Sequence, residues 1–170
     1  TLHATGYVFR SSSYCVNCHN GGSFIDRFDG DGKMTRATTN EGITCAVCHD
    51  PHPGPGMENE HMLRTLAAVQ LGTFTNITAG IPGAVVATIT TGGKGQLCMQ
   101  CHKARQGAAV NTLSSSSFGT HASPQTDMLS GNNAIEYGGL SIDGVLNPHL
   151  SVPDTCVHCH MQYIKTDPNP

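Results

Sequence analysis

Eight cysteines and four of the ten histidines in this 170-residue chain fall into one repeated pattern, C-x-x-C-H. Two thiols with this spacing, followed at once by an imidazole, form the attachment signature of c-type haem. On a helical turn the two thiols share one side and can add to the two vinyl groups of a porphyrin, while the imidazole binds its iron. The pattern therefore predicts covalent haem attachment.

Four copies of the pattern use every cysteine in the chain, so we expect four covalently bound c-type haems, each containing iron. The expected thioether residues are Cys15, Cys18, Cys45, Cys48, Cys98, Cys101, Cys156 and Cys159. The expected proximal iron ligands are His19, His49, His102 and His160.

Two other uses of paired cysteines remain as alternatives. Four C-x-x-C pairs can build two zinc sites of four thiolates each, but such sites place no requirement on the next residue, which is His in all four copies. A disulfide framework also uses an even number of cysteines, although a disulfide within C-x-x-C is strained and typical of redox catalysts. The invariant His favours haem.

Each iron needs a second axial ligand, and six histidines lie outside the proximal positions. These are His3, His52, His61, His121, His149 and His158. Methionine is the rival ligand, but Met99 lies inside an attachment loop and Met161 directly follows a proximal His. We therefore expect two histidines at every iron.

The surroundings of these histidines favour some of them as distal ligands. His52 lies between two prolines and on the wrong side to reach the iron of its own motif, so it would serve a neighbouring haem. His121 precedes an expected helix start, and His149 follows Pro148. His3 is the least constrained. The alternatives are a surface His in a Pro-Gly turn for His52 and a capping or surface His for His121.

The two remaining histidines are weaker candidates. His61 lies in a segment that we expect to be a short helix from about residue 57 to 70. His158 lies inside its own attachment loop, where we expect it to be exposed.

Composition limits the fold and the partners. Leu, Ile, Val and Phe make up only 33 of the 170 residues, Trp is absent, and 12% of residues are charged. We expect the four porphyrins to supply the missing apolar core. The formal net charge of -3 and the lack of a basic face argue against nucleic acid as a partner. No apolar stretch approaches the roughly 20 residues of a membrane span.

The segments between the motifs are rich in Gly and Pro and predict little regular structure. We expect a strand over 84–90 and a helix starting at Ser123 and Pro124. The expected fold class is mostly coil with short α-helices and minimal β-structure, a multihaem c-type cytochrome fold with the haems as its core. We expect a single domain, residues 1–170.

Segments beyond the four motifs resemble a known family. They include C-H-D-P-H at residues 48–52 with Leu63 and Arg64 after it, H-A-S-P-Q-T-D-M-L-S-G from His121, and H-L-S-V-P-D-T from His149. Together with the motifs they look like the tetrahaem extracellular cytochrome filament proteins, the OmcE-like nanowire subunits. The resemblance covers nearly the whole chain.

The resemblance implies bis-His haems wrapped in coil, with distal ligation by His3, His52, His121 and His149. It also implies that one haem per subunit takes its distal His from the next subunit, for which His3 on its terminal arm is the candidate. His61 and His158 are departures from the family pattern.

An iron with two protein imidazoles has no open position for a substrate, so we expect an electron conductor and not an enzyme. The favoured function is an extracellular or cell-surface filament subunit in a head-to-tail homopolymer, which passes electrons to redox proteins or external acceptors. The alternative is a discrete periplasmic tetrahaem carrier that docks on reductases. A third hypothesis is an enzyme or the electron-input module of an enzyme.

Overall fold

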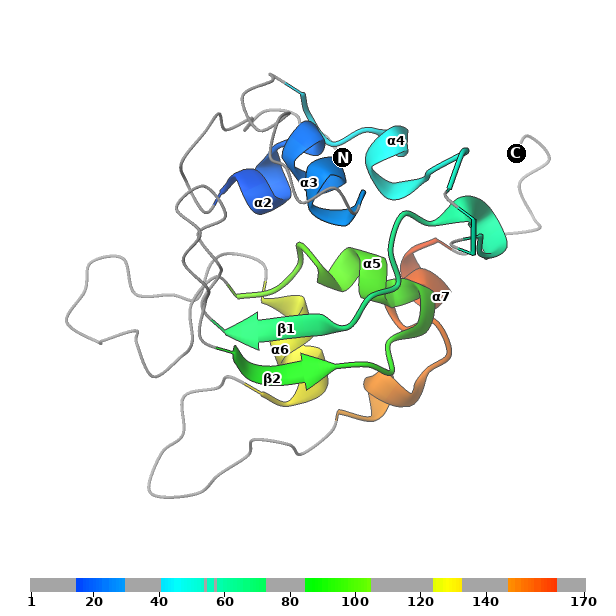
Figure 1. Cartoon of the computed structure of the whole chain (residues 1–170). Coiled ribbons are helices and arrows are strands. Elements are labelled where there is room, and N and C mark those ends of the chain that lie inside the picture. The colour runs from blue at the N-terminus through cyan, green and yellow to red at the C-terminus, as the bar shows by residue number, and fades with distance from the viewer. Residues whose placement is uncertain are drawn as a thin grey trace.

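The computed structural model describes residues 15–29, 41–53, 55–56, 58–72, 85–104, 124–132 and 147–161. Within these ranges, short helices and irregular backbone surround a two-stranded sheet (Figure 1). The expected fold class, mostly coil with short α-helices and minimal β-structure, is confirmed. No helix in the described ranges is long and apolar enough to cross a membrane.

The described elements follow one another along the chain as short pieces, of which the longest has eight residues. They are α2 (Val16–His19), α3 (Gly21–Phe28), α4 (Cys45–Cys48), η1 (Glu60–Met62), β1 (Val69–Gly72), β2 (Val85–Ile89), η2 (Gly93–Gly95), α5 (Gln96–Met99), α6 (Gln125–Ser130), η4 (Pro148–Ser151) and α7 (Cys156–His160).

Helices α2 and α3 are separated by Asn20, whose extended backbone ends the first and caps the second. Its side-chain oxygen accepts the amide of Ser23 at 2.8 Å, which satisfies one of the free amides at the start of α3. Gly21 follows, and a Cβ there would overlap the carbonyl oxygen of Gly42. The glycine thus lets the chain leading into α4 pass directly against the start of α3.

The sheet is an antiparallel pair in which Val69 faces Ile89 and Leu71 faces Ala87. The expected strand over 84–90 is confirmed as β2. Its partner β1 was not predicted, although Val69 and Leu71 are buried while Gln70 between them is exposed, as the alternation of a strand requires.

The expected helix from about residue 57 to 70 is wrong. The structure has a single 3-10 turn at η1, followed by irregular backbone and then β1. His61 and Met62 have φ angles of 70° and 49°, which cannot continue a right-handed helix. Pairing of Val69 with Ile89 overrides the helical propensity of this segment.

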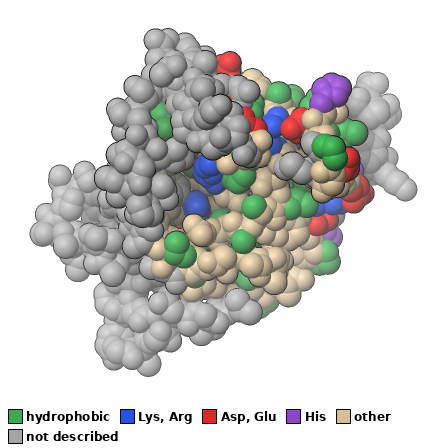
Figure 2. Space-filling view, viewed as in Figure 1, with side chains coloured by type: hydrophobic (Ala, Val, Ile, Leu, Met, Phe, Trp, Pro, Cys, Tyr) green, Lys and Arg blue, Asp and Glu red, His purple; other side chains and the backbone are tan. Residues whose placement is uncertain are grey.

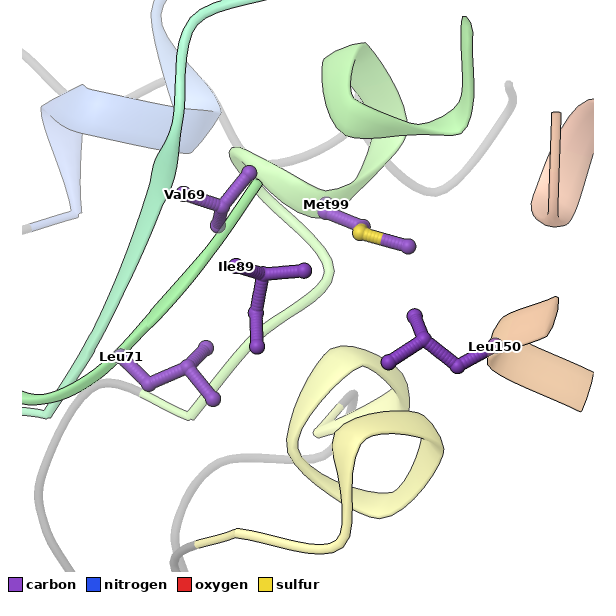
Figure 3. Packing of buried hydrophobic residues seen from close by; sticks show 5 residues of the cluster. All are labelled: Val69, Leu71, Ile89, Met99 and Leu150. Atoms are coloured by element: carbon purple, nitrogen blue, oxygen red, sulfur yellow. The ribbon is translucent and has the colours of Figure 1, made fainter. Parts of the chain in front are cut away.

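Two apolar clusters lie on either side of α5. One contains Val69, Leu71, Ile89, Met99 and Leu150, which come from both strands, α5 and η4 (Figure 3). The other contains Phe24, Val47 and Leu97 and joins α3, α4 and α5. Leu97 and Met99 point to different clusters, so α5, which begins the third C-x-x-C-H motif, is the element that connects the two halves of the described core.

The expected helix after Ser123 is confirmed with a small shift. Pro124 occupies the capping position, and α6 runs from Gln125 to Ser130 before Gly131 ends it in the left-handed conformation. Hydrophobic side chains on the visible described surface are scattered and do not form one patch (Figure 2). The large exposed ones are Met62, Leu66, Val85, Met128 and Met161.

Candidate functional site

All four C-x-x-C-H motifs form a helical turn. In the first three, the amide of the motif His donates to the carbonyl of the first Cys, at 2.8, 2.8 and 3.0 Å. In the fourth, α7 spans the whole motif from Cys156 to His160. This turn brings the two thiols of each motif to neighbouring positions on one helix face, the arrangement that attachment to two vinyl groups of one porphyrin requires.

The third motif lies at the centre of the four. The side chain of its Cys101 hydrogen-bonds with that of Cys18 in the first motif, and the side chain of its Cys98 hydrogen-bonds with that of Cys156 in the fourth. The Cys18 thiol also contacts the Cys101 carbonyl at 3.9 Å. None of the eight cysteines, all of which lie in the described ranges, forms a disulfide. Groups attached at the first, third and fourth motifs would therefore start from adjacent sulfur atoms.

The thiol pairs shift the pKa values of their members in opposite directions. Hydrogen bonding to Cys98 lowers the pKa of Cys156 to about 6, and the same contact raises that of Cys98. Hydrogen bonding to Cys101 lowers the pKa of Cys18, while the pKa of Cys101 is raised. At Cys48, burial raises the pKa of the thiol.

Two cationic side chains flank the contact between the first and third motifs. Arg27 donates to the Gln100 side chain at 2.6 Å, and its guanidinium lies 4.4 Å from the ring centre of Phe28. Lys103 donates to the carbonyl of Gln70 at 2.5 Å, and burial, followed by the charge of Arg27, lowers its pKa to about 8. The charges of both side chains act on the neighbouring Cys18 thiol.

The imidazole of the second motif is oriented by a main-chain carbonyl. His49 Nδ1 lies 2.8 Å from the carbonyl oxygen of His61. Because a carbonyl only accepts, Nδ1 is the donor, and in the neutral imidazole the lone pair is then on Nε2. This is the tautomer that a histidine needs to bind a metal through Nε2.

His149 is prepared in the same way. Its Nδ1 lies 2.7 Å from the side-chain oxygen of Asn147, which also accepts the His149 amide at 3.0 Å. Since that oxygen is an acceptor, His149 Nδ1 is the donor and Nε2 is left as the lone-pair nitrogen. Pro148 begins η4 between the two residues and fixes the local backbone. Both imidazoles are thus suited to bind an iron through Nε2.

The other predicted site residues have different surroundings. His52 is exposed, and its amide donates to Asp50 at 3.2 Å. His102, Cys159 and His160 are exposed, and the His102 carbonyl accepts two bonds from Thr126 of α6, from the amide at 2.9 Å and the hydroxyl at 2.6 Å. The start of α6 therefore lies against the third motif. His3 and His121 themselves lie outside the described residues.

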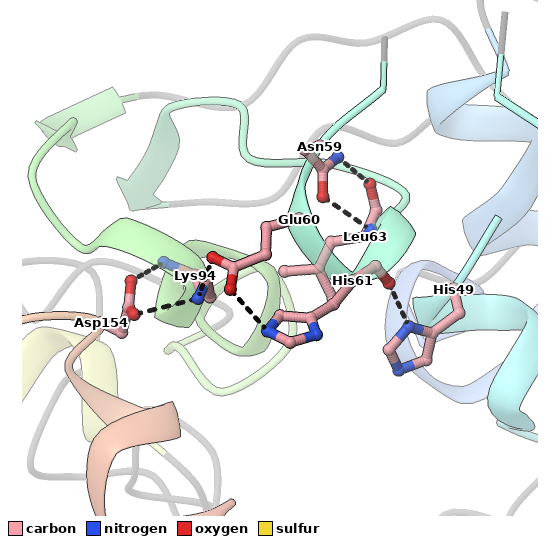
Figure 4. A network of polar contacts seen from close by, with 7 residues as sticks. All are labelled: His49, Asn59, Glu60, His61, Leu63, Lys94 and Asp154. Carbon is pink, nitrogen blue, oxygen red and sulfur yellow. Dashed lines mark hydrogen bonds and ion pairs between the residues drawn. The ribbon is translucent and has the colours of Figure 1, made fainter. Parts of the chain in front are cut away.

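The two departures from the family pattern are both exposed, His158 on α7 as expected and His61 on η1. His61 Nε2 lies 3.3 Å from Glu60, and Glu60 in turn pairs with Lys94 at 2.7 Å (Figure 4). Lys94 also contacts Asp154 at 3.5 Å. This ionic network connects the segment beside the second motif with the residues that precede the third and fourth motifs.

Sequence reasoning missed three side chains that shape the second motif and its surroundings: Asn59, Arg64 and Lys94. Asn59 bonds the amide and carbonyl of Leu63, at 2.8 and 2.7 Å. Of these three, only Arg64 had been noted in the sequence, as part of the family resemblance and without a role.

Among the described residues, no group of three or more His, Cys, Asp or Glu side chains is arranged to hold a bare metal ion. The donor set fits haem: paired thiols on a helical turn, and two histidines, His49 and His149, with Nε2 available.

Comparison with known proteins gives one similarity of low degree. No family model and no curated protein sequence matches the chain. A matching solved structure is an undecahaem cytochrome from the S-layer of Carboxydothermus ferrireducens, with 24% sequence identity and a TM-score of 0.48. The match covers 94% of this chain and 21% of that one, so the chain spans about a fifth of its length.

Proposed function

We propose that the chain is a tetrahaem c-type cytochrome that conducts electrons. The observation that carries the proposal is the set of four C-x-x-C-H motifs, each on a helical turn, of which the third lies beside the first and the fourth. Haem iron bound at these positions supplies one-electron oxidation and reduction.

The residues divide this work in a simple way. The cysteines would hold each haem covalently, and the motif histidines would bind its iron. His3, His52, His121 and His149 are the proposed ligands on the other side. With two histidines held for each iron, no position would remain for a substrate, so the proposed protein would conduct electrons and would not act as an enzyme. Adjacent motifs keep the cofactors close enough for electrons to pass between them.

The first experiment measures haem content and iron ligation in protein produced with the c-type attachment machinery. Intact mass and the pyridine haemochrome spectrum should give four covalent haems, and electron paramagnetic resonance should give low-spin iron only. Fewer than four haems would contradict the assignment of the motifs. A reduced haem that binds carbon monoxide rapidly at neutral pH would contradict bis-His ligation and would favour the enzyme hypothesis.

We further propose that the protein acts outside the cell as a subunit of a head-to-tail filament for long-range electron transfer. The support is the family resemblance, in which a distal His crosses between subunits. Electron microscopy of the native haem-loaded protein should show uniform filaments, and a His3→Ala variant should disperse them. A monomer at all concentrations in size-exclusion chromatography would instead favour the periplasmic carrier, and intact His3→Ala filaments would exclude His3 as the shared ligand.

A further inference from the structure

The segment 59–64 lies antiparallel to the end of the second motif. His49 and Leu63 form an isolated β-bridge, the amide of Asp50 donates to the Met62 carbonyl at 2.8 Å, and the amide of Arg64 donates to the Cys48 carbonyl at 2.8 Å. These contacts on both sides of His49 bring the carbonyl of His61 to its Nδ1 atom, at 2.8 Å (Figure 4).

The backbone of His61 and Met62 is held in an unfavourable conformation. Both have positive φ angles, 70° and 49°, which side chains with a Cβ rarely adopt. Asn59 stabilises this turn, because its amide group bridges both main-chain polar groups of Leu63, at 2.7 and 2.8 Å. The turn directs the His61 carbonyl toward His49.

Arg64 fixes the same segment to the attachment loop. Its guanidinium donates to the carbonyls of Ala46 at 2.7 Å and Val47 at 3.2 Å, the two residues between the cysteines, and to the Asp50 carboxylate at 3.0 Å. Only 9% of the Arg64 side chain is exposed. One side chain therefore holds the loop before His49 and the residue after it.

The imidazole of His61 does not take part in this contact. It is directed away from His49 toward Glu60, while the carbonyl of the same residue faces His49 (Figure 4). His61 thus offers its main chain, and not its ring, to the second motif.

We propose that Asn59 and Arg64 are positioning residues that act through the His61 carbonyl on His49, the proximal ligand of the second haem; this rests on the proposed function. A carbonyl that accepts a hydrogen bond from the Nδ1–H group increases the basicity of Nε2. A more basic ligand stabilises oxidised iron. The clamp, meaning Asn59, Arg64 and the His61 carbonyl that they position, therefore lowers the potential of this haem relative to the same haem without it.

The test compares three variants of the haem-loaded protein by electron paramagnetic resonance and by a spectroelectrochemical titration. Asn59→Leu removes both bonds to Leu63, and should raise one of the four midpoint potentials and change one low-spin signal. Asn59→Asp keeps the acceptor and loses the donor, so it should produce a smaller shift of the same signal. His61→Asn keeps a residue that tolerates positive φ, and should retain four low-spin haems with unchanged potentials.

Asn132→Leu is the matched control, because Asn132 also donates to a main-chain carbonyl, that of Ser130 at 3.0 Å, but at the end of α6. It should leave all four potentials unchanged. If Asn59→Leu loses its fold, Asn59→Asp decides. Four unchanged potentials in the Asn59 variants would overturn the clamp but not the tetrahaem function.

A high-spin haem in His61→Asn would identify the His61 ring as a ligand and also overturn the clamp. A wild type without covalent haem at Cys45 and Cys48 would overturn both this inference and the proposed function, and the haem count of the same preparation separates this result from the others.

Discussion

The second and third motifs are held in opposite ways. In the third, Met99 and Gln100 are buried, as is Leu97 just before it, and the motif contacts cysteines of two other motifs. In the second, Cys45, Ala46 and His49 are exposed, and side-chain hydrogen bonds from the 59–64 segment maintain the local geometry. The third motif is held mainly by packing that it shares with its neighbours. The second contributes only Val47 to the buried cluster with Phe24 and Leu97, and its exposed part is held by polar contacts with the 59–64 segment.

This difference predicts how far a substitution acts. Changes at the third motif should disturb several proposed haems together, because its helix carries residues of both apolar clusters. Changes around the second motif should alter one haem and leave the stability of the whole protein nearly intact.

The largest effect is expected at Gly95, just before α5. A Cβ there would overlap Thr155 Oγ1 and lie 2.9 Å from the Asp154 carbonyl oxygen. Thr155 cannot easily rotate away, because its hydroxyl is buried and donates to the Gly92 carbonyl at 2.8 Å. We expect Gly95→Ala to lower the free energy of unfolding by about 3 kcal/mol.

Denaturant unfolding of the haem-loaded protein, followed by the Soret band, measures this loss. Gly56→Ala is the control, because nothing lies within 4 Å of a Cβ at Gly56 and only its positive φ of 80° opposes the change. A similar loss in both variants would contradict close docking of the third motif on the turn before the fourth.

The next effect is expected at the first residue between the cysteines. Met99→Gln places an amide in the cluster formed with Leu71 and Leu150, and should cost about 2 kcal/mol. Ala46→Gln is the same change at the matching position of the second motif, where the side chain is exposed, and should stay within about 0.5 kcal/mol. Equal losses in chemical denaturation would remove the distinction between the two motifs.

A smaller and more local effect is expected at Arg64. Arg64→Leu removes the bonds to Ala46, Val47 and Asp50, and we expect a cost of about 1 kcal/mol because water can solvate the exposed carbonyl of Ala46. One midpoint potential should rise while three remain unchanged. Shifts at several haems in the same titration would show that the second motif is not an independent unit.

The sequence predicted the elements that local chemistry determines. The four C-x-x-C-H turns, the strand over 84–90 and the helix after Pro124 are found in the structure, because each depends on spacing, β-branching or a proline at a helix start. His149, one of the predicted distal ligands, lies in η4 directly after Pro148.

The remaining features depend on contacts distant in sequence. The segment 57–70 has helical propensity, yet Asn59 and the pairing of Val69 with Ile89 override it. The central place of the third motif follows from Leu97 and Met99 facing two separate clusters, which no local pattern reveals. Distal ligation at His3, His52, His121 and His149 stays a prediction.

The smallest effect is expected at Lys94, which lies before the third motif. It pairs with Glu60 beside the second motif and with Asp154 before the fourth. The hydrogen bond with Glu60 raises the pKa of Lys94 above 10.5 and lowers that of Glu60 below 4.5, and the Lys94 backbone amide lowers the pKa of Asp154. Because the carboxyl pKa values are lowered, these groups add stability at pH values above the ordinary carboxyl pKa, and that stability is lost as the pH falls. Because the lysine pKa is raised, Lys94 adds stability at pH values below the ordinary lysine pKa, and that stability is lost as the pH rises.

The Lys94 network should therefore stabilise the protein between about pH 4.5 and 10.5, and only slightly, because its groups are solvated and screened by salt. Lys94→Gln should lower the melting temperature slightly at pH 7 and low salt, and less at high salt, whereas Glu41→Gln, an exposed carboxylate outside the network, should have no such pattern. Potentials should stay unchanged in both. If Lys94→Gln moved a potential as far as Arg64→Leu, the ionic network would position His49 as strongly as the clamp, and the second motif would depend on the third.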